Sequence, residues 1–273
     1  MSTQTASNQP ETPPEEMPYV APCRILQVSA PLRWLRLGWA DLIRAPRLSL
    51  AYGVALMLLS MAIGAFTLRY GTMALYIGLA TGFVFVGPVL AIGLYSISRQ
   101  LEAGQNPVLG YCMREGKDHL RELMVLGLIL LVVLLVWARA ATTMYIFFPD
   151  QANPDWRDML PFLGIGSVVG AVFASIVFAA SAFSLPMLLD RKVDSITAVV
   201  TSVNAVLRNK PAMFVWAGLI GICVLLGFAT AFLGFAVLLP LIGHATWHAY
   251  IEAIDASAWP KNEPVAGGKE WAT

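Results

Sequence analysis

Long stretches without a charged side chain are the feature that most constrains this chain. A membrane-spanning helix needs about 20 apolar residues to cross a hydrocarbon core of about 30 Å. One run of that length, residues 123–148, contains a single charged residue, Arg139. Four further runs contain no Asp, Glu, Lys or Arg: 48–68, 71–98, 159–189 and 211–251. The sequence therefore predicts an all-α integral membrane protein.

The longest run indicates how many times the chain crosses the membrane. Residues 211–251 are too many for one helix at 1.5 Å per residue and suit two, with a turn within residues 228–235. We therefore expect six transmembrane helices that form three hairpins. The predicted spans are residues 48–68, 71–98, 123–148, 159–189, 212–229 and 232–250.

The distribution of basic residues predicts the orientation. With both termini inside, the inner segments hold 15 Lys and Arg residues, whereas the outer loops hold two, Arg69 and Arg157. This positive-inside bias predicts a multi-pass protein of the bacterial inner membrane with both termini in the cytoplasm. Residues 1–30 lack the apolar segment of a signal peptide, and their composition predicts a disordered cytoplasmic leader. Residues 254–273 are predicted to form a disordered cytoplasmic tail. Residues 31–253 would form the membrane domain.

The membrane domain shows a threefold internal pattern. Residues 31–100, 105–192 and 193–252 would each contain an amphipathic interfacial helix followed by two spans. The second span of each unit carries a proline near its inner end. Proline removes a helical hydrogen bond and kinks the helix, so we expect three matching kinks, although membrane helices also tolerate single prolines. The three prolines are Pro88, Pro186 and Pro240.

The first amphipathic segment, "PLRWLRLGWADLIRAP" at residues 31–46, predicts a helix that lies in the plane of the membrane surface. Its apolar face gathers Leu32, Leu35, Trp39, Leu42 and Ile43. Basic residues lie beside that face, a pattern that suits an anionic inner leaflet. Alternatively, the helix only caps the bundle. The residues expected at the membrane surface are Arg33, Trp34, Arg36, Trp39, Arg44 and Arg47.

Two histidines in "LLPLIGHATWHAY" are candidates for a metal site. His244 and His248 are four residues apart and share one helical face, but a zinc site needs three or four ligands. Asp190 and Glu252 are the nearest candidates for a further ligand. Asp190 and His244 both follow a unit's proline by four residues and would face each other around a threefold axis. Alternatively, the histidines belong to an interfacial belt with Trp247 and Tyr250.

Other features inside the spans carry weaker signals. Arg139 would either reach the outer surface, near Asp150, Asp155 or Asp158, or face the bundle on an ion or solute pathway. Small residues at helical spacing predict faces where helices approach closely. These residues are Gly78, Gly82, Gly166, Gly170 and Ala174.

Four stretches of the chain resemble a known family. They are "PLRWLRLGWADLIRAPRLSLAYG", "GPVLAIGLYSISRQLEAGQ", "FSLPMLLDRKVDSITAVVTS" and "PLIGHATWHAY". They are similar to blocks of a bacterial family of predicted integral membrane proteins, number twenty-one eighty-nine in the series of domains of unknown function. The resemblance covers roughly residues 30–253 and implies no established activity. Some members are labelled as cytochrome c oxidase components, yet this chain lacks the histidines of a haem–copper subunit.

Three classes of function compete. The first is a non-catalytic accessory or assembly subunit of a membrane complex, such as a respiratory one. The second is a small-solute or ion transporter or channel, and the third a metal-binding membrane enzyme. The sequence contains no nucleotide-binding, serine-hydrolase or zinc-protease motif, so we expect no enzyme and no cofactor. Expected partners are the lipid bilayer, other subunits or a second copy, and no nucleic acid.

Overall fold

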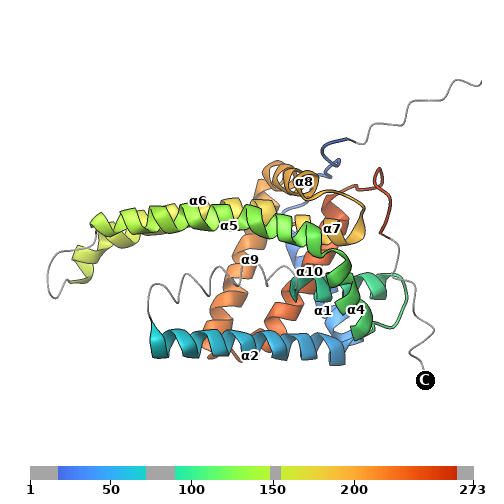
Figure 1. Ribbon diagram of the computed structural model, residues 1–273, viewed down its shortest axis with the longest axis horizontal. Coiled ribbons are helices and arrows are strands. Elements are labelled where there is room, and N and C mark those ends of the chain that lie inside the picture. The colour runs from blue at the N-terminus through green and yellow to red at the C-terminus, as the bar shows by residue number, and fades with distance from the viewer. Residues whose placement is uncertain (1–17, 72–89, 148–154, 263–273) are drawn as a thin grey trace, which may run out of the picture.

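The computed structural model describes residues 18–71, 90–147 and 155–262, and within these ranges the chain forms helices with two isolated β-bridges and no strand. Figure 1 shows how the helices are arranged. In chain order they are α1 (Ala30–Arg44), α2 (Pro46–Tyr70), a helix over residues 90–102, α4 (Leu109–Asp118), α5 (Leu120–Met144), the 3-10 helix η1 (Tyr145–Phe147), α6 (Trp156–Ser181), α7 (Ser184–Asp190), α8 (Ser195–Arg208), α9 (Lys210–Ala229) and α10 (Phe235–Ala253).

Four stretches in the described part of the chain are long and apolar enough to cross a membrane. They are α2, α5, α9 and residues 156–190, which contain α6 and α7. Their mean hydropathy is 1.9 to 2.6, yet at most 28% of each 18-residue window is buried. Helices this apolar are otherwise buried in a core, so their exposure indicates lipid contact. The predicted spans 48–68, 123–148, 159–189 and 212–229 correspond to these helices.

The other two predicted spans, 71–98 and 232–250, do not correspond to any of these four stretches. Most of span 71–98 lies outside the described residues, and only its end is seen, in the helix over residues 90–102. α10 takes the place of span 232–250, but it is not among the four apolar stretches, and its last half is mostly buried. The arrangement of six spans as three hairpins therefore stays a prediction.

The turn between α9 and α10 lies where the sequence predicted it. α9 ends at Ala229 and α10 begins at Phe235, within the expected residues 228–235. The reversal places Ala231 and Phe232 at φ values of 49° and 70°, the left-handed region. The ring of Phe232 packs on α2, where it would lie 2.9 Å from a Cβ atom added at Gly64.

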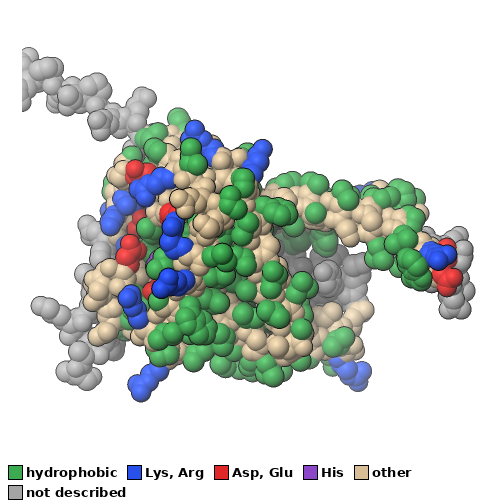
Figure 2. All heavy atoms as spheres, turned by 180° about the vertical axis from the view of Figure 1, so that it is seen from behind, with side chains coloured by type: hydrophobic (Ala, Val, Ile, Leu, Met, Phe, Trp, Pro, Cys, Tyr) green, Lys and Arg blue, Asp and Glu red, His purple; other side chains and the backbone are tan. Residues whose placement is uncertain are grey.

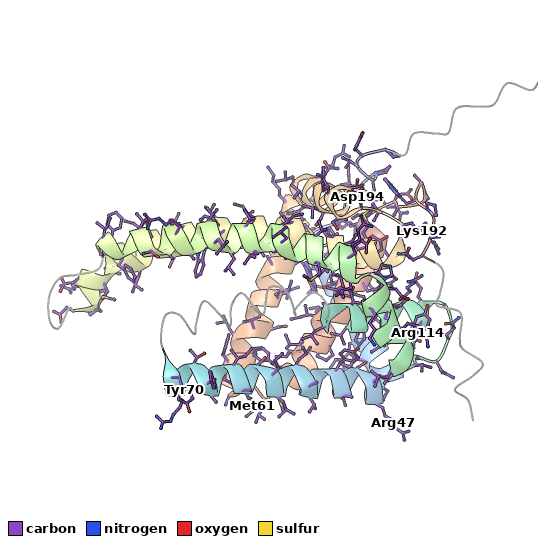
Figure 3. All side chains as sticks on the ribbon, in the orientation of Figure 1. Arg47, Met61, Tyr70, Arg114, Lys192 and Asp194 are labelled. Carbon is purple, nitrogen blue, oxygen red and sulfur yellow. The ribbon has the colours of Figure 1, made fainter. Side chains whose placement is uncertain are left out.

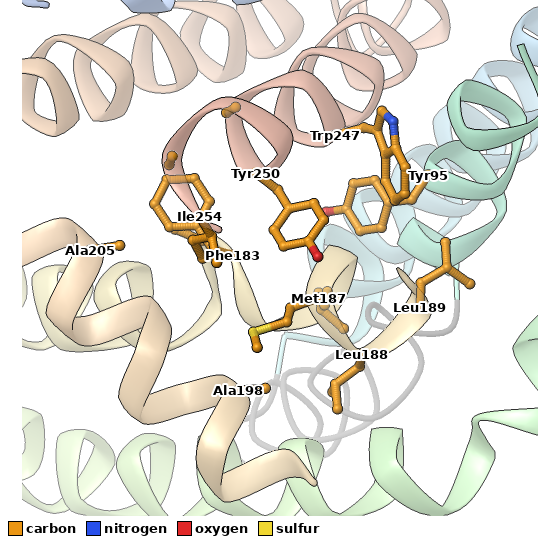
Figure 4. Packing of buried hydrophobic residues seen from close by; sticks show 14 of the residues in the cluster. Tyr95, Phe183, Met187, Leu188, Leu189, Ala198, Ala205, Trp247, Tyr250 and Ile254 are labelled. Carbon is orange, nitrogen blue, oxygen red and sulfur yellow. The ribbon is translucent and has the colours of Figure 1, made fainter. Parts of the chain in front are cut away.

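The hydrophobic core lies at the broad end of the molecule, where α10 packs against α1 and α2. Figure 4 shows the α10 rings of Trp247 and Tyr250 together with Tyr95 and Met187. Charged side chains gather at the same end, and Figure 3 labels Arg114, Lys192 and Asp194 there. This end is therefore both the packed core and the polar pole of the molecule.

Glycines let α10 approach its neighbours closely. A Cβ atom at Gly53 of α2 would overlap the Ala236 carbonyl, and one at Gly38 of α1 would lie 2.7 Å from the Ala245 nitrogen. Small residues at helix crossings allow such close packing in membrane proteins. α1 and α2 are therefore held on α10 by backbone contact.

α5 and α6 form an antiparallel pair that extends away from the rest of the molecule, as Figure 1 shows. α8 packs across the base of the pair. The expected close-packing face on α6 is open, because a Cβ atom at Gly166 or Gly170 would meet nothing within 4 Å. Gly78 and Gly82 lie outside the described residues. Beyond its base on α8, the pair thus leaves much of its apolar surface exposed among the described residues.

The prolines behave differently from one another. Pro186 lies in the first turn of α7, where a missing N–H is tolerated, and the helix break comes just before it, between Ser181 and Ser184. The Ser202 hydroxyl of α8 bridges this break, since it accepts the Phe183 N–H (3.1 Å) and donates to the Ala179 carbonyl (2.7 Å). α10 continues through Pro240, whereas Pro88 lies outside the described residues.

Parts of both terminal segments lie against the helices, although the sequence predicted disorder there. The N–H of Ala21 donates to the Thr201 hydroxyl of α8 (3.1 Å), and residues 23 and 254 form a β-bridge. Trp259 is 4% exposed. Apolar residues such as Trp259 explain the difference, because they can be buried even in a segment of polar composition.

Candidate functional site

His244 lies at the buried end of α10 with none of its surface exposed. Its Nε2 atom is 2.9 Å from the Ser49 hydroxyl of α2, and its Nδ1 atom is 2.8 Å from the Ser98 hydroxyl. A neutral imidazole satisfies both contacts, because one ring nitrogen donates to a hydroxyl and the other accepts from one. Both nitrogens are thus occupied, and His244 joins α10, α2 and the helix over residues 90–102.

His248 is one turn further along α10 and bonds to a different helix. Its Nε2 atom is 2.8 Å from the Asp41 carboxylate of α1. Asp41 is 3% exposed, and a buried carboxylate without a partner would be costly. The two histidines therefore connect two pairs of helices rather than forming one chelating pair.

Asp190, at the end of α7, has its own partners. Its carboxylate accepts the Tyr250 hydroxyl at 2.9 Å and the Arg191 Nε–H at 2.8 Å. Across the described ranges, no three His, Cys, Asp or Glu side chains gather as a metal ion would require. The structure thus does not bring Asp190, His244 and His248 together into one ligand set.

Two tryptophans that the sequence placed at the membrane interface, Trp247 in the belt and Trp34 in the α1 set, are buried. Trp247 is 1% exposed, and its Nε1–H donates to Glu102 at 2.8 Å. Trp34 is fully buried, donates to Glu252 at 2.9 Å, and packs edge-on against Trp216 with ring centroids 5.6 Å apart. Both rings hold helices together, because each ring is buried and its N–H donates to a carboxylate on another helix.

The predicted membrane-surface set on α1 is divided between the two sides of the helix. Trp34 faces α10, and Arg33 pairs with Glu252. The outward face carries apolar and basic residues together, as a helix at a membrane surface requires. The exposed members of the set are Arg33, Arg36, Trp39 and Arg44 on α1, and Arg47 at the start of α2.

A buried clamp at the C-terminal segment is the main feature that the sequence did not reveal. The side-chain nitrogen of Asn262 lies 3.0 Å from the carbonyls of residues 188, 189 and 191 and 2.9 Å from His119 Nε2, so its two N–H groups are shared among these acceptors. Arg99 donates to the Asn262 carbonyl and to Glu115 (2.9 Å). One Glu115 oxygen is buried without a hydrogen-bond partner among the described residues. Single polar residues far apart in the sequence show no pattern that would predict this cluster.

A hollow of about 390 Å³ lies next to the clamp. Acidic and basic side chains are equally numerous in its lining, so the hollow favours neither anionic nor cationic ligands. The acidic residues are Asp118, Glu122 and Asp194, and the basic ones are Arg121, Arg191 and Lys192. Partial burial raises the pKa of Asp194. Hydrogen bonds from the Thr197 side chain and from the backbone N–H groups of Thr197 and Ile196 have a larger, opposite effect, so the pKa of Asp194 lies below its usual value. That carboxylate caps α8, at 2.9 Å from both backbone nitrogens.

Arg139 lies far from this polar end. It is on α5, its side chain is exposed, and it makes no ion pair in the described part of the chain. Among the described residues it has no ion-pair partner, and its place on an ion or solute pathway stays a prediction.

The amino-acid sequence was compared with protein families, and one family model matches. Residues 75–190 match DUF2189, a family described as predicted integral membrane proteins. This match confirms the resemblance to that family over residues 75–190, fewer than the 30–253 expected. With the four apolar helices, it identifies an integral membrane protein. No curated protein and no solved structure matches the chain.

Proposed function

We propose that this DUF2189 protein is a non-catalytic accessory or assembly subunit of a membrane complex, such as a respiratory complex. One contrast carries the proposal. The polar side chains that could form a site are used in contacts between helices, whereas the apolar α5–α6 pair, beyond its base on α8, has almost no partner among the described residues. In residues 156–190, the most apolar window is 0% buried.

The polar end behaves as a structural joint. His244, His248, Asp190 and Trp247 each hold a second helix or segment through hydrogen bonds of 2.8 to 2.9 Å. A transporter would need polar groups along a path, and a metal enzyme would need free ligands. In the part of the chain that the structure describes, no feature favours either alternative.

The uncovered surface behaves as a contact surface. Figure 2 shows hydrophobic side chains along the protruding pair and charged ones at its tip. Lipid covers part of such a surface, and small residues such as Gly166 and Gly170 also let another helix approach closely. An accessory subunit needs a surface of this kind.

The topology forms part of the proposal. Six spans in the bacterial inner membrane, with both termini in the cytoplasm, agree with the basic residues and with the turn between α9 and α10. The order α1–α2–(90–102), α4–α5–α6–α7 and α8–α9–α10 also agrees with three repeated units. A single cysteine at Thr230, in a chain without its native cysteines, should react with an impermeant maleimide from outside, whereas one at Lys192 should not. The reverse pattern would refute the topology.

Quantitative mass spectrometry tests the proposed function. The tagged chain is crosslinked in its native membrane, purified in mild detergent, and compared with a tagged membrane protein of similar abundance. We expect one defined set of membrane proteins at constant ratio to the chain. Purification of the chain alone, with no constant partner after crosslinking, would refute the proposal.

A further inference from the structure

The exposed face of α5 carries one charge within a long apolar stripe. Leu128, Val132 and Leu135 are 52% to 56% exposed, and Arg139 continues the same face at helical spacing. Nothing else in the described chain covers this face, because α6 and α8 pack on other sides of α5. Among the described residues the stripe is therefore open to lipid or to another protein.

Lipid is a poor environment for Arg139. Charged side chains within the hydrocarbon region face protein or water, where they find a counter-charge. Arg139 is eight residues before Phe147, roughly 12 Å along a helix, so it lies well below the outer end of the span.

The acidic residues at the outer end do not neutralise Arg139 in this structure. Asp158 accepts the Asp155 N–H at 3.1 Å and so helps to begin α6. Neither carboxylate forms an ion pair with Arg139. A counter-charge at the depth of Arg139 must come from outside the described chain.

A second copy of the chain does not supply that counter-charge within the membrane. The five apolar runs that form the predicted spans contain no Asp or Glu. The acidic residues near α5 and α6, which are Glu122, Asp150, Asp155 and Asp158, lie at or beyond the helix ends in the sequence rather than at the depth of Arg139. The partner must therefore differ from this chain.

We propose that the face of α5 with Leu128, Val132, Leu135 and Arg139 docks against a transmembrane helix of another protein, and that this helix carries an Asp or Glu at the depth of Arg139. An arginine–carboxylate pair gives such a contact both strength and register. This inference rests on the proposed accessory function, for which it specifies the chemistry of the partner.

A photo-crosslinking amino acid at Leu135 tests the proposal in the full-length protein in its native membrane. The probe is placed in the parent chain and in the variants Arg139→Leu, Arg139→Lys and Arg157→Leu. Arg157, at the outer end of α6, is the matched control, since it stacks over Trp156 with its guanidinium carbon 5.4 Å from the ring centroid. The crosslinked peptide is then sequenced.

We expect an adduct with a membrane span of another protein that contains Asp or Glu. Arg139→Leu should reduce the yield at least tenfold, whereas Arg139→Lys and Arg157→Leu should retain it. An adduct with lipid alone, with a second copy, with a span lacking an acidic residue, or one unaffected by Arg139→Leu would overturn the proposal. The proteins that purify with the chain are identified in a separate experiment. If they form a constant set but the Leu135 probe crosslinks only to lipid, the proposed docking face on α5 is refuted, whereas the proposed accessory function is not.

Discussion

Replacing His244 by alanine should destabilise the folded protein more than any exposed substitution at the same end. The change removes both hydrogen bonds of the imidazole, at 2.9 and 2.8 Å, and leaves the buried hydroxyls of Ser49 and Ser98 without this partner. Unsatisfied buried groups cost about 1–3 kcal/mol each, and the cavity adds to that cost. We therefore expect the free energy of unfolding to fall by about 3–5 kcal/mol.

The assay is thermal unfolding of the purified protein in mild detergent, followed by size-exclusion chromatography. For a chain of this size, about 4 kcal/mol corresponds to a fall in Tm of roughly 8–16 °C. The exposed substitution Arg36→Ala is the control and should change stability by less than about 0.5 kcal/mol. The Ser49→Ala/His244→Ala double variant should lose less than the sum of the single changes, by about 1 kcal/mol, because the partners interact.

One result would refute this reasoning. If His244→Ala left the unfolding temperature within about 2 °C of the parent but abolished a cellular function, the histidine would act as a functional site. An unchanged unfolding temperature in Ser49→Ala would strengthen that conclusion, because removing either partner of a stabilising buried hydrogen bond should lower the stability of the fold.

Three further predictions address other contacts. Gly53→Val should sharply reduce the yield of folded protein, because a side chain there overlaps the Ala236 carbonyl. The control Gly218→Val, at an open position, should not reduce the yield. Equal yields of the two variants would contradict the close approach of α2 and α10. Asn262→Ala should speed hydrogen exchange in residues 254–262, and unchanged exchange would show that the clamp does not hold this segment. Because the pKa of Asp194 is lower in the folded protein than in the unfolded chain, its ionised carboxylate stabilises the fold at pH values above the ordinary aspartate pKa. This stabilisation is lost as the pH falls through the pKa of Asp194 in the folded protein. Asp194→Asn should therefore make the unfolding temperature depend less on pH in the acid range, as measured by thermal unfolding.

The membrane helices could be predicted because they depend on local composition. Long apolar runs with at most one charged residue predicted α2, α5, α6 and α9 to within a few residues at most ends. The excess length of 211–251 located the turn before α10. Both signals follow from the thickness of the bilayer, which acts on each span separately.

The side of α1 that faces the protein could not be predicted from its apolar stripe. Leu32, Trp39 and Ile43 are 47% to 59% exposed, whereas Gly38 and Asp41 are buried against α10. In membranes, apolar side chains gain little by packing on protein rather than lipid, so small and hydrogen-bonding residues select the inner face. The small residues around Gly38 were therefore the better signal.

The polar joints were only partly visible in the sequence. His244, His248 and Asp190 stood out because such residues are rare near apolar runs, but their partners Ser49, Ser98 and the others did not. Hydrogen bonds between residues more than 140 positions apart depend on how helices cross, which periodicity does not encode. The sequence thus identified unusual residues and not their arrangement.

Native mass spectrometry of the particle released from its own membrane tests the central claim most directly. The chain has a mass of 29.6 kDa. The account predicts a particle that contains this chain together with at least one different membrane protein, and release of the free chain from the Arg139→Leu variant. A particle of the parent chain whose mass is 29.6 kDa, or a whole multiple of it, would contradict the account.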